Sequence, residues 1–150
     1  MKALITGSLL LGTVLLARAD SLAPEKQVEY RQAGYRYMAW NMGRIKEQLD
    51  GGHYDARQVQ AAAGAIASIA SSGMGALYGP GTATDKLGDK TRLKPEFFAQ
   101  RDKAAQLAGE LNTATRKLAS AAAKGDRDAL RIAFGETGAA CKACHSAFRN

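Results

Sequence analysis

The sequence predicts an all-α protein that folds as an antiparallel four-helix bundle. Four segments carry apolar residues at alternating three- and four-residue steps, which place these residues on one face of a helix. No run of roughly four to eight residues alternates apolar and polar side chains as a half-buried strand does. Short connections at 50–54 and 125–126 join the first two and the last two segments, which favours antiparallel neighbours.

Before the first helix, residues 1–19 have the pattern of a secretory signal peptide. A positively charged start precedes an uncharged, mostly apolar stretch over 3–16, and Ala17 and Ala19 are the small residues that precede a cleavage site. A membrane anchor is the alternative, but the apolar stretch is shorter than the roughly 20 residues that a spanning helix needs. We therefore expect cleavage after Ala19 and a mature domain that covers 20–150.

The first helix is expected from about Pro24 to Leu49. Pro24 and Glu25 suit an opening turn, and Asp50-Gly51-Gly52 ends the periodic pattern. Its apolar stripe, which Arg31 and Gln32 interrupt, comprises Val28, Tyr35, Met38, Ala39, Met42, Ile45 and Leu49. A second apolar face of this helix is indicated by Tyr37, Trp40 and Ile45, of which Ile45 is also counted on the stripe.

The second helix is expected to begin after Asp55, a good N-cap residue. Its inward residues are mostly small and continue to Gly73, and the glycine- and proline-rich stretch 75–82 ends it. The connection over 79–94 is the longest in the chain and is polar. A loop of this length in a compact domain is often functional or crosses the fold.

The third helix is expected to open near Pro95 and Glu96 and to continue past Leu118. Gly125 suits the end of that helix and Asp126 suits the cap of the fourth. The fourth helix carries both cysteines and one of the two histidines of the chain.

Composition argues against two classes of partner. The formal net charge is +7, but lysine and arginine are interleaved with acidic residues and form no dense basic run. We therefore expect no nucleic-acid partner. No second apolar run approaches membrane length, so we expect no membrane association after signal cleavage.

The chemistry is concentrated in Cys141-Lys142-Ala143-Cys144-His145. A tetrahedral zinc site needs four ligands, whereas the chain offers only these three and His53. A thioredoxin-like pair needs its first cysteine at a helix start, typically in a βαβ setting. A disulfide between Cys141 and Cys144 closes a very small loop and leaves His145 unexplained.

Covalent haem uses all three side chains. Cys-x-x-Cys-His is the attachment sequence of c-type haem, in which each thiol adds to one vinyl group and the histidine binds iron axially. We therefore expect one haem c per chain, attached after export, which agrees with a signal peptide and places the protein in the periplasm. Only residues 146–150 follow His145, so a sixth iron ligand would have to come from upstream.

Four stretches of the sequence resemble the cytochrome c′ family, the class II cytochromes c. They are EYRQAGYRYMAWNMGRIK (29–46), IASSGMGALYGPGT (69–82), KTRLKPEFF (90–98) and AFGETGAACKACHSAFR (133–149). The chain is most similar to members from purple sulfur bacteria that have a tyrosine on the distal side of the haem.

The resemblance implies a left-handed antiparallel bundle with the haem near one end, usually as a homodimer. It also implies a high-spin, mostly five-coordinate iron that binds NO and CO. The roles proposed for the family are NO binding or detoxification and electron transfer, here with an unidentified redox partner.

Transferred residue by residue, the resemblance assigns Cys141 and Cys144 to haem attachment and His145 to the proximal iron position. Arg149, one turn beyond His145, corresponds to an arginine beside the proximal imidazole. Its cation should disfavour imidazolate character and weaken the iron–histidine bond. The alternative for Arg149 is a solvated side chain that interacts with the helix dipole.

On the opposite side, the resemblance assigns Arg31 and Gln32 to a haem propionate, and arginine suits carboxylates well. Thr91 and Arg92 complete this polar shell in the same comparison. Tyr35 is expected over the distal iron face, where it blocks the sixth position and must move for a ligand to enter. The alternative for Arg31 is a side chain that extends from the wet edge of the stripe into solvent, and the alternative for Tyr35 is an ordinary core residue.

A first-helix methionine gives an alternative function, because some low-spin relatives are electron carriers with such a sixth ligand. Met38 is the candidate, and Met42 is also on the stripe, although a methionine in a helical stripe is more often core. An enzyme such as a peroxidase is not expected. No distal histidine and arginine pair is evident, since His53 lies in a predicted loop.

Overall fold

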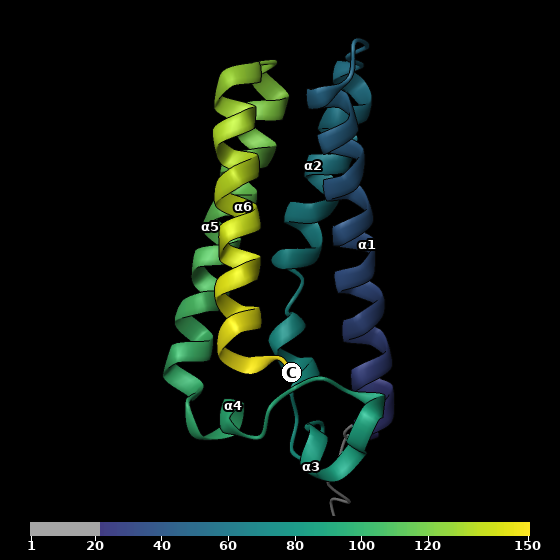
Figure 1. Ribbon diagram of the computed structural model, residues 1–150, viewed down its shortest axis with the longest axis vertical. Helices are drawn as coiled ribbons and strands as arrows, with labels where there is room; N and C mark the ends of the chain where they lie inside the picture. The colour runs from purple at the N-terminus through teal and green to yellow at the C-terminus, as the bar shows by residue number, and fades with distance from the viewer. Residues whose placement is uncertain (1–21) are drawn as a thin grey trace, which may run out of the picture.

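The computed structural model describes residues 22–150, which form a bundle of four long helices (Figure 1). The predicted signal peptide, 1–19, lies outside the described residues. The long helices are α1 (Pro24–Asp50), α2 (Ala56–Ala70), α5 (Arg101–Lys124) and α6 (Arg127–Phe148). Shorter elements are η1 (Met74–Leu77), α3 (Thr84–Leu87), η2 (Gly88–Lys90) and α4 (Glu96–Ala99). The predicted all-α class and bundle are confirmed, and none of these helices is long and apolar enough to cross a membrane.

Most helix ends lie where local sequence signals place them. Pro24 is the first residue of α1, and Gly51 follows its last residue. Asp55 and Asp126 cap α2 and α6, because each carboxylate accepts hydrogen bonds of 2.9 to 3.2 Å from backbone N–H groups of the first turn. Gly125 ends α5 in the left-handed conformation, with φ 70°, that glycine adopts without strain.

Two predicted boundaries are wrong. The second helix ends at Ala70 rather than near Gly73, which has φ 82° and leads into η1. The third predicted helix is two helices, because the backbone leaves the helical region at Gln100, with φ −121° and ψ 47°. This break allows Phe97 to turn into the apolar cluster at that end of the bundle.

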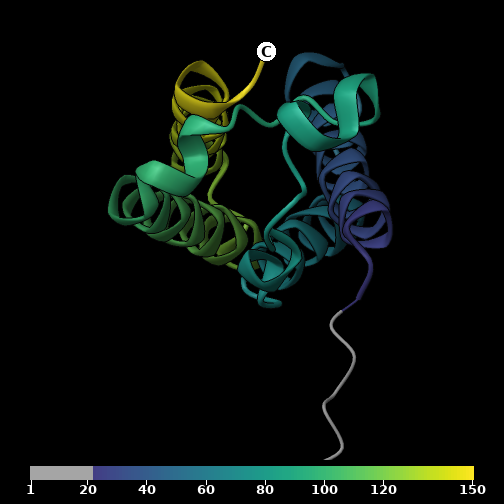
Figure 2. The ribbon, with the colours of Figure 1, turned by 90° about the horizontal axis from the view of Figure 1, so that it is seen from below.

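The helices pack in the order α1, α2, α5, α6. Figure 2 shows α2 between α1 and α5, and α5 between α2 and α6. The remaining pair, α1 and α6, approach each other at few positions. Since the helices are antiparallel, the first half of α1 and the second half of α6 lie at the same end of the bundle (Figure 1).

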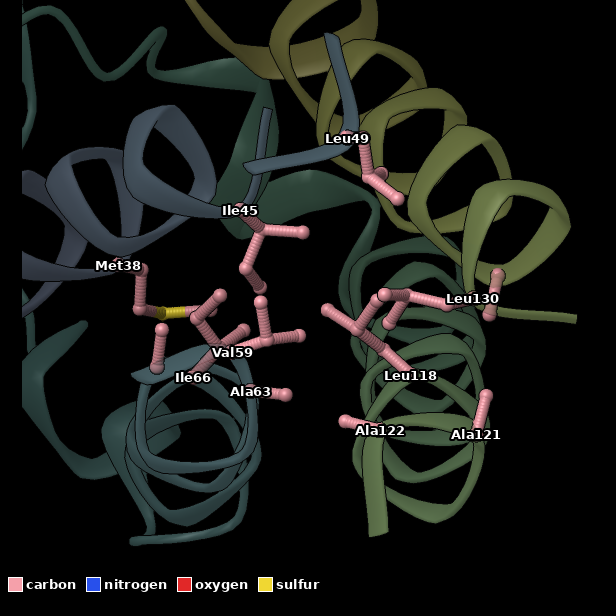
Figure 3. Packing of buried hydrophobic residues seen from close by; sticks show 12 residues of the cluster. Met38, Ile45, Leu49, Val59, Ala63, Ile66, Leu118, Ala121, Ala122 and Leu130 are labelled. Atoms are coloured by element: carbon pink, nitrogen blue, oxygen red, sulfur yellow. The ribbon is translucent and has the colours of Figure 1, made fainter. Parts of the chain in front are cut away.

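The core has two parts. The upper cluster joins all four long helices (Figure 3) and comprises Met38, Ile45, Leu49, Val59, Ala62, Ala63, Ile66, Leu118, Ala121, Ala122, Leu130 and Ala133. The lower cluster lies around the end of α6 and comprises Ala83, Leu93, Phe97, Ala104 and Phe148. Because Ile45 is fully buried in the upper cluster, the prediction that it belongs to a second, outward face of α1 is wrong. Tyr37 and Trp40 are exposed and stack on each other at 5.5 Å.

Candidate functional site

The motif residues lie together on the last turns of α6. Cys141 precedes Cys144 and His145 by three and four residues, and Phe148 follows His145 and Cys144 by three and four, so the four side chains lie on one side of the helix. Phe148 is buried in the lower cluster, and Cys144 packs against the same cluster. Both cysteines are free thiols and partly buried, whereas His145 is exposed.

The environment of the two thiols is unlike that of a redox pair. Burial raises the pKa of Cys141 and of Cys144, and Cys144 raises the pKa of Cys141 further. A redox-active Cys-x-x-Cys pair instead needs one thiol whose pKa is lowered, because the thiolate is the reactive form. The surroundings of these thiols therefore favour attachment over thiol–disulfide exchange.

His145 opens onto a surface pocket of about 340 Å³ lined by Arg92, His145, Ser146, Arg149 and Asn150. Partial burial lowers the pKa of His145, and the cations of Arg149 and Arg92 lower it further. These effects favour the neutral form of the imidazole, which is the form that binds iron. Arg149 lies beside this imidazole.

Arg92 does not lie beside Arg31 and Gln32, the polar group in which the family resemblance places it. Its Nε donates a 2.6 Å hydrogen bond to the carbonyl oxygen of Asn150, beside His145. Thr91 points the other way and accepts from Arg31, because the backbone at Thr91 is extended, with φ −133° and ψ 162°, and successive side chains of an extended chain alternate in direction.

Arg31 is buried, with 4% of its surface exposed, and its two Nη atoms donate four hydrogen bonds. Nη1 donates to the Leu77 carbonyl oxygen and to Thr82 Oγ1, and Nη2 donates to the Thr82 carbonyl oxygen at 2.9 Å and to Thr91 Oγ1 at 2.7 Å. Gln32 lies on the same side and donates from Nε2 to the Lys90 carbonyl oxygen.

The charge of Arg31 has no carboxylate partner within 4.0 Å among residues 22–150. Burial lowers the pKa of its guanidinium, which reflects the cost of holding a cation away from water. A guanidinium has five N–H donors. The Nη atoms use four of them in these bonds, so the Nε–H is still available to a further acceptor. A haem propionate is a carboxylate, and it would supply the anion that this buried cation lacks.

The Tyr35 hydroxyl on α1 lies in the neighbourhood of the two thiols of α6. Burial raises the pKa of Tyr35, and its hydroxyl is close enough to Cys144 and Cys141 for their charges to raise the pKa further. The side chain is still 36% exposed. Distal, proximal and attachment candidates from both helices therefore meet at the lower end of the bundle.

Tyr78 is a site residue that sequence reasoning missed. Its hydroxyl donates a 3.2 Å hydrogen bond to the hydroxyl of Tyr35, and its ring stacks on Phe97 with centroids 4.7 Å apart. Its only local signal is an aromatic residue in the glycine-rich stretch 75–82, where a buried ring is not expected. The contact forms because the chain at η1 packs against α1, and no periodic pattern in the sequence predicts that packing.

The methionine and histidine of the alternative functions lie elsewhere. Met38 is 4% exposed and packs within the upper cluster, and Met42 packs partly against it. His53 belongs to the connection between α1 and α2, at the other end of the bundle from the last turns of α6 (Figure 1).

Sequence comparisons match almost the whole described chain. The family model described as Cytochrome C′ matches residues 26–149. The cytochrome c′ of Allochromatium vinosum is 52% identical over 143 residues, which is 95% of this chain and 92% of that protein.

Solved structures agree with this match. The structure of cytochrome c′ from Thermochromatium tepidum has a TM-score of 0.81 and 55% identity, covering 86% of this chain and 98% of that one. A cytochrome c′ described as having an unusual ligand-controlled dimer dissociation also has a TM-score of 0.81 and 55% identity, with 85% and 97% covered. A cytochrome c′ variant from Alcaligenes xylosoxidans with bound NO is 34% identical and has a TM-score of 0.75, covering 85% of this chain and 95% of that one. A variant from the same organism with bound carbon monoxide is 35% identical and has a TM-score of 0.76, covering 85% of this chain and 97% of that one.

Proposed function

The chain belongs to the cytochrome c′ family, whose cofactor is haem c, and from this premise we propose that it is a periplasmic, high-spin haem protein that binds NO and CO. The observation that carries the proposal is the position of Tyr35. Its hydroxyl on α1 lies near enough to Cys141 and Cys144 of α6 to interact with them electrostatically, while Met38, the alternative sixth ligand, is buried in the upper cluster. The iron of the bound cofactor supplies the position at which a diatomic ligand binds.

Cys141, Cys144 and His145 hold the cofactor in this proposal. Cys141 and Cys144 would hold the haem through two thioethers formed with its vinyl groups. His145 would bind the iron through its imidazole. Arg149 and Arg92 place two cations beside this imidazole, which disfavours imidazolate character and so weakens its bond to the metal.

Arg31 and Gln32 orient the propionates. Arg31 is a buried cation without a carboxylate partner among residues 22–150, and its Nε–H is the donor not used by the loop. Gln32 contributes a neutral amide beside it. These two side chains and the thioethers fix the cofactor at opposite edges.

Tyr35 guards the distal face. A ring at this position excludes bulky and strongly hydrated ligands, since it must swing aside before anything reaches the metal. Small uncharged diatomic molecules lose little hydration on entry and are favoured. The NO- and CO-bound structures of family members support this ligand class.

We further propose a homodimer through the outer face of α1. Tyr30, Tyr37 and Trp40 are all more than half exposed on this helix, and Arg44 lies over the Trp40 ring at 4.9 Å. Exposed aromatic rings beside an arginine are typical of interface hot spots. The family member with ligand-controlled dimer dissociation supports this assembly.

Electron transfer is the second candidate, and it rests on the charge around His145. The exposed cations Arg92, Lys142 and Arg149 lie beside the proximal imidazole or within its motif, and none forms an ion pair within residues 22–150. A redox partner with an acidic surface would suit them.

Optical spectra of the purified protein test the function. We expect a c-type spectrum with a high-spin, five-coordinate signature and a shift on adding CO or NO to the reduced form. Tyr35→Ala should raise CO affinity, whereas Tyr54→Ala, at the other end of the bundle, should not. A colourless protein, or a methionine–iron charge-transfer band in the oxidised form, would refute the proposal. Periplasmic fractions should contain a chain that begins at Asp20.

A further inference from the structure

The hydroxyl groups of Tyr35 and Tyr78 form a contact that the proposed function does not yet use. Tyr78 Oη donates to Tyr35 Oη at 3.2 Å, across 43 positions of sequence. The contact joins α1 to the connection that follows η1. Since Tyr35 is the side chain that must move for a ligand to enter, whatever holds its hydroxyl also holds the entrance closed.

Tyr78 is anchored on both faces of its ring. One contact is a parallel stack on Phe97, with centroids 4.7 Å apart and an interplanar angle of 20°. Another is the Arg31 guanidinium, 4.5 Å from the ring centroid. Phe97 in turn packs edge-on against Phe148 at the end of α6.

Tyr35 has fewer restraints. It is 36% exposed, and its hydroxyl has one hydrogen-bond partner among residues 22–150, which is Tyr78. The pair is therefore asymmetric: the ring of Tyr78 stays in place, and Tyr35 leaves it.

We propose that Tyr78 is a positioning residue that latches Tyr35 over the distal face, so that breaking the hydroxyl pair is part of admitting a diatomic ligand. This inference rests on the proposed function. When Tyr35 swings away, both hydroxyls lose their partner. Tyr78 then remains packed against the apolar lower cluster with its hydroxyl unpaired. The latch therefore makes the closed position more stable and slows ligand entry.

The size of the effect follows from one neutral hydrogen bond. Such a bond changes a two-state equilibrium by about 2- to 12-fold. Removing either hydroxyl breaks the same bond, so the two removals should not multiply. Two independent steric effects would multiply.

The test uses the haem-loaded protein and the variants Tyr78→Phe, Tyr35→Phe and the double variant. Tyr78→Phe keeps the ring that stacks on Phe97 and deletes only the hydroxyl. We expect CO association rate and affinity to rise about 2- to 12-fold in each single variant and by the same factor in the double variant. Tyr54→Phe is the matched control, because Tyr54 also has an arginine, Arg127, 4.5 Å from its ring centroid but packs against the upper cluster.

Two results would overturn the latch: CO binding by Tyr78→Phe equal to that of the unaltered protein, or a double variant whose effect is the product of the single ones. A purely structural role for Tyr78 would lower the urea midpoint of Tyr78→Phe without this non-additivity, and that result also counts against the latch. If even Tyr35→Ala binds no CO, the proposed function fails. If Tyr35→Ala gains affinity while Tyr78→Phe does not, only the latch fails.

Discussion

Replacing Arg31 with lysine tests how the loop over 77–91 is held. The substitution keeps the positive charge but exchanges two Nη nitrogens, which reach four acceptors, for a single Nζ. One ammonium cannot occupy both positions of the guanidinium fork. The change therefore removes hydrogen bonds without removing the cation, and it separates geometry from charge.

The magnitude follows from those bonds. A single Nζ at the Nη2 position would keep the bonds to the Thr82 carbonyl oxygen and to Thr91 Oγ1. It would lose the Nη1 bonds to the Leu77 carbonyl oxygen and to Thr82 Oγ1. Hydrogen bonds to a charged group contribute about 1.5–3 kcal/mol each, so losing two costs about 3–6 kcal/mol before relaxation. Water that reaches the part-buried Leu77 carbonyl reduces this, and we expect a loss of about 3 kcal/mol in the free energy of unfolding. That is a large share of the roughly 5–15 kcal/mol of a typical domain.

Urea unfolding of the haem-loaded protein at neutral pH measures this loss, and hydrogen exchange locates it. Backbone amides over 79–91 should exchange faster in Arg31→Lys, while those of the upper cluster should not. Arg44→Lys is the control on the same helix, because Arg44 makes one surface hydrogen bond, to Gln58 Oε1. A loss below about 0.5 kcal/mol in Arg31→Lys, equal to that of the control, would refute the reasoning.

Three further predictions concern the core, the assembly and the effect of pH. Leu118→Ala, at a fully buried position in the upper cluster, should cost about 2–5 kcal/mol in urea unfolding, and a loss under about 1 kcal/mol would contradict the packing described. Trp40→Glu should shift the protein to monomer in sedimentation velocity, whereas Ile132→Glu, at a position on α6 that is also more than half exposed, should leave a dimer. Hydrogen bonds from Gln58 hold the pKa of Asp55 below its ordinary value, so its stabilising effect is present above the unfolded pKa and is lost as the pH falls through the folded pKa. Asp55→Asn should therefore be less stable than the unaltered protein at pH 6 and equally stable near pH 2; a gap that persists at low pH would contradict this.

The helices could be predicted well because their ends depend on neighbouring residues. Proline at the start of α1, aspartate caps on α2 and α6, and the left-handed Gly125 act through bonds within one turn. The break at Gln100 was missed because its cause is tertiary. The break depends on the packing of the Phe97 ring against the rings of Tyr78 and Phe148, which are far away in sequence.

The same distinction applies to the site. Cys141, Cys144 and His145 could be placed on one face because they lie within one helix. Tyr78 could not be found, and the contact of Arg92 with Asn150 could not be predicted, because both residues lie in the long connection whose path is set by distant contacts. Ile45 shows the reverse error, since an isolated helix pattern does not reveal which of two apolar faces the rest of the fold covers.

The long connection also explains how His145 can be held in the last turn of a helix. Helix ends fray because their last carbonyl groups lack partners within the helix. At the end of α6 the segment around Leu93 supplies partners: Lys94 N–H donates to the Phe148 carbonyl, and Asn150 N–H donates to the Arg92 carbonyl, both at 2.9 Å. Thr91, at the start of this segment, is bound by Arg31, whose guanidinium also covers Tyr78. The segment that packs against the end of α6, which carries His145, is thus continuous with the network of Arg31, Tyr78 and Tyr35. A perturbation of Arg31 should consequently alter both faces of the site.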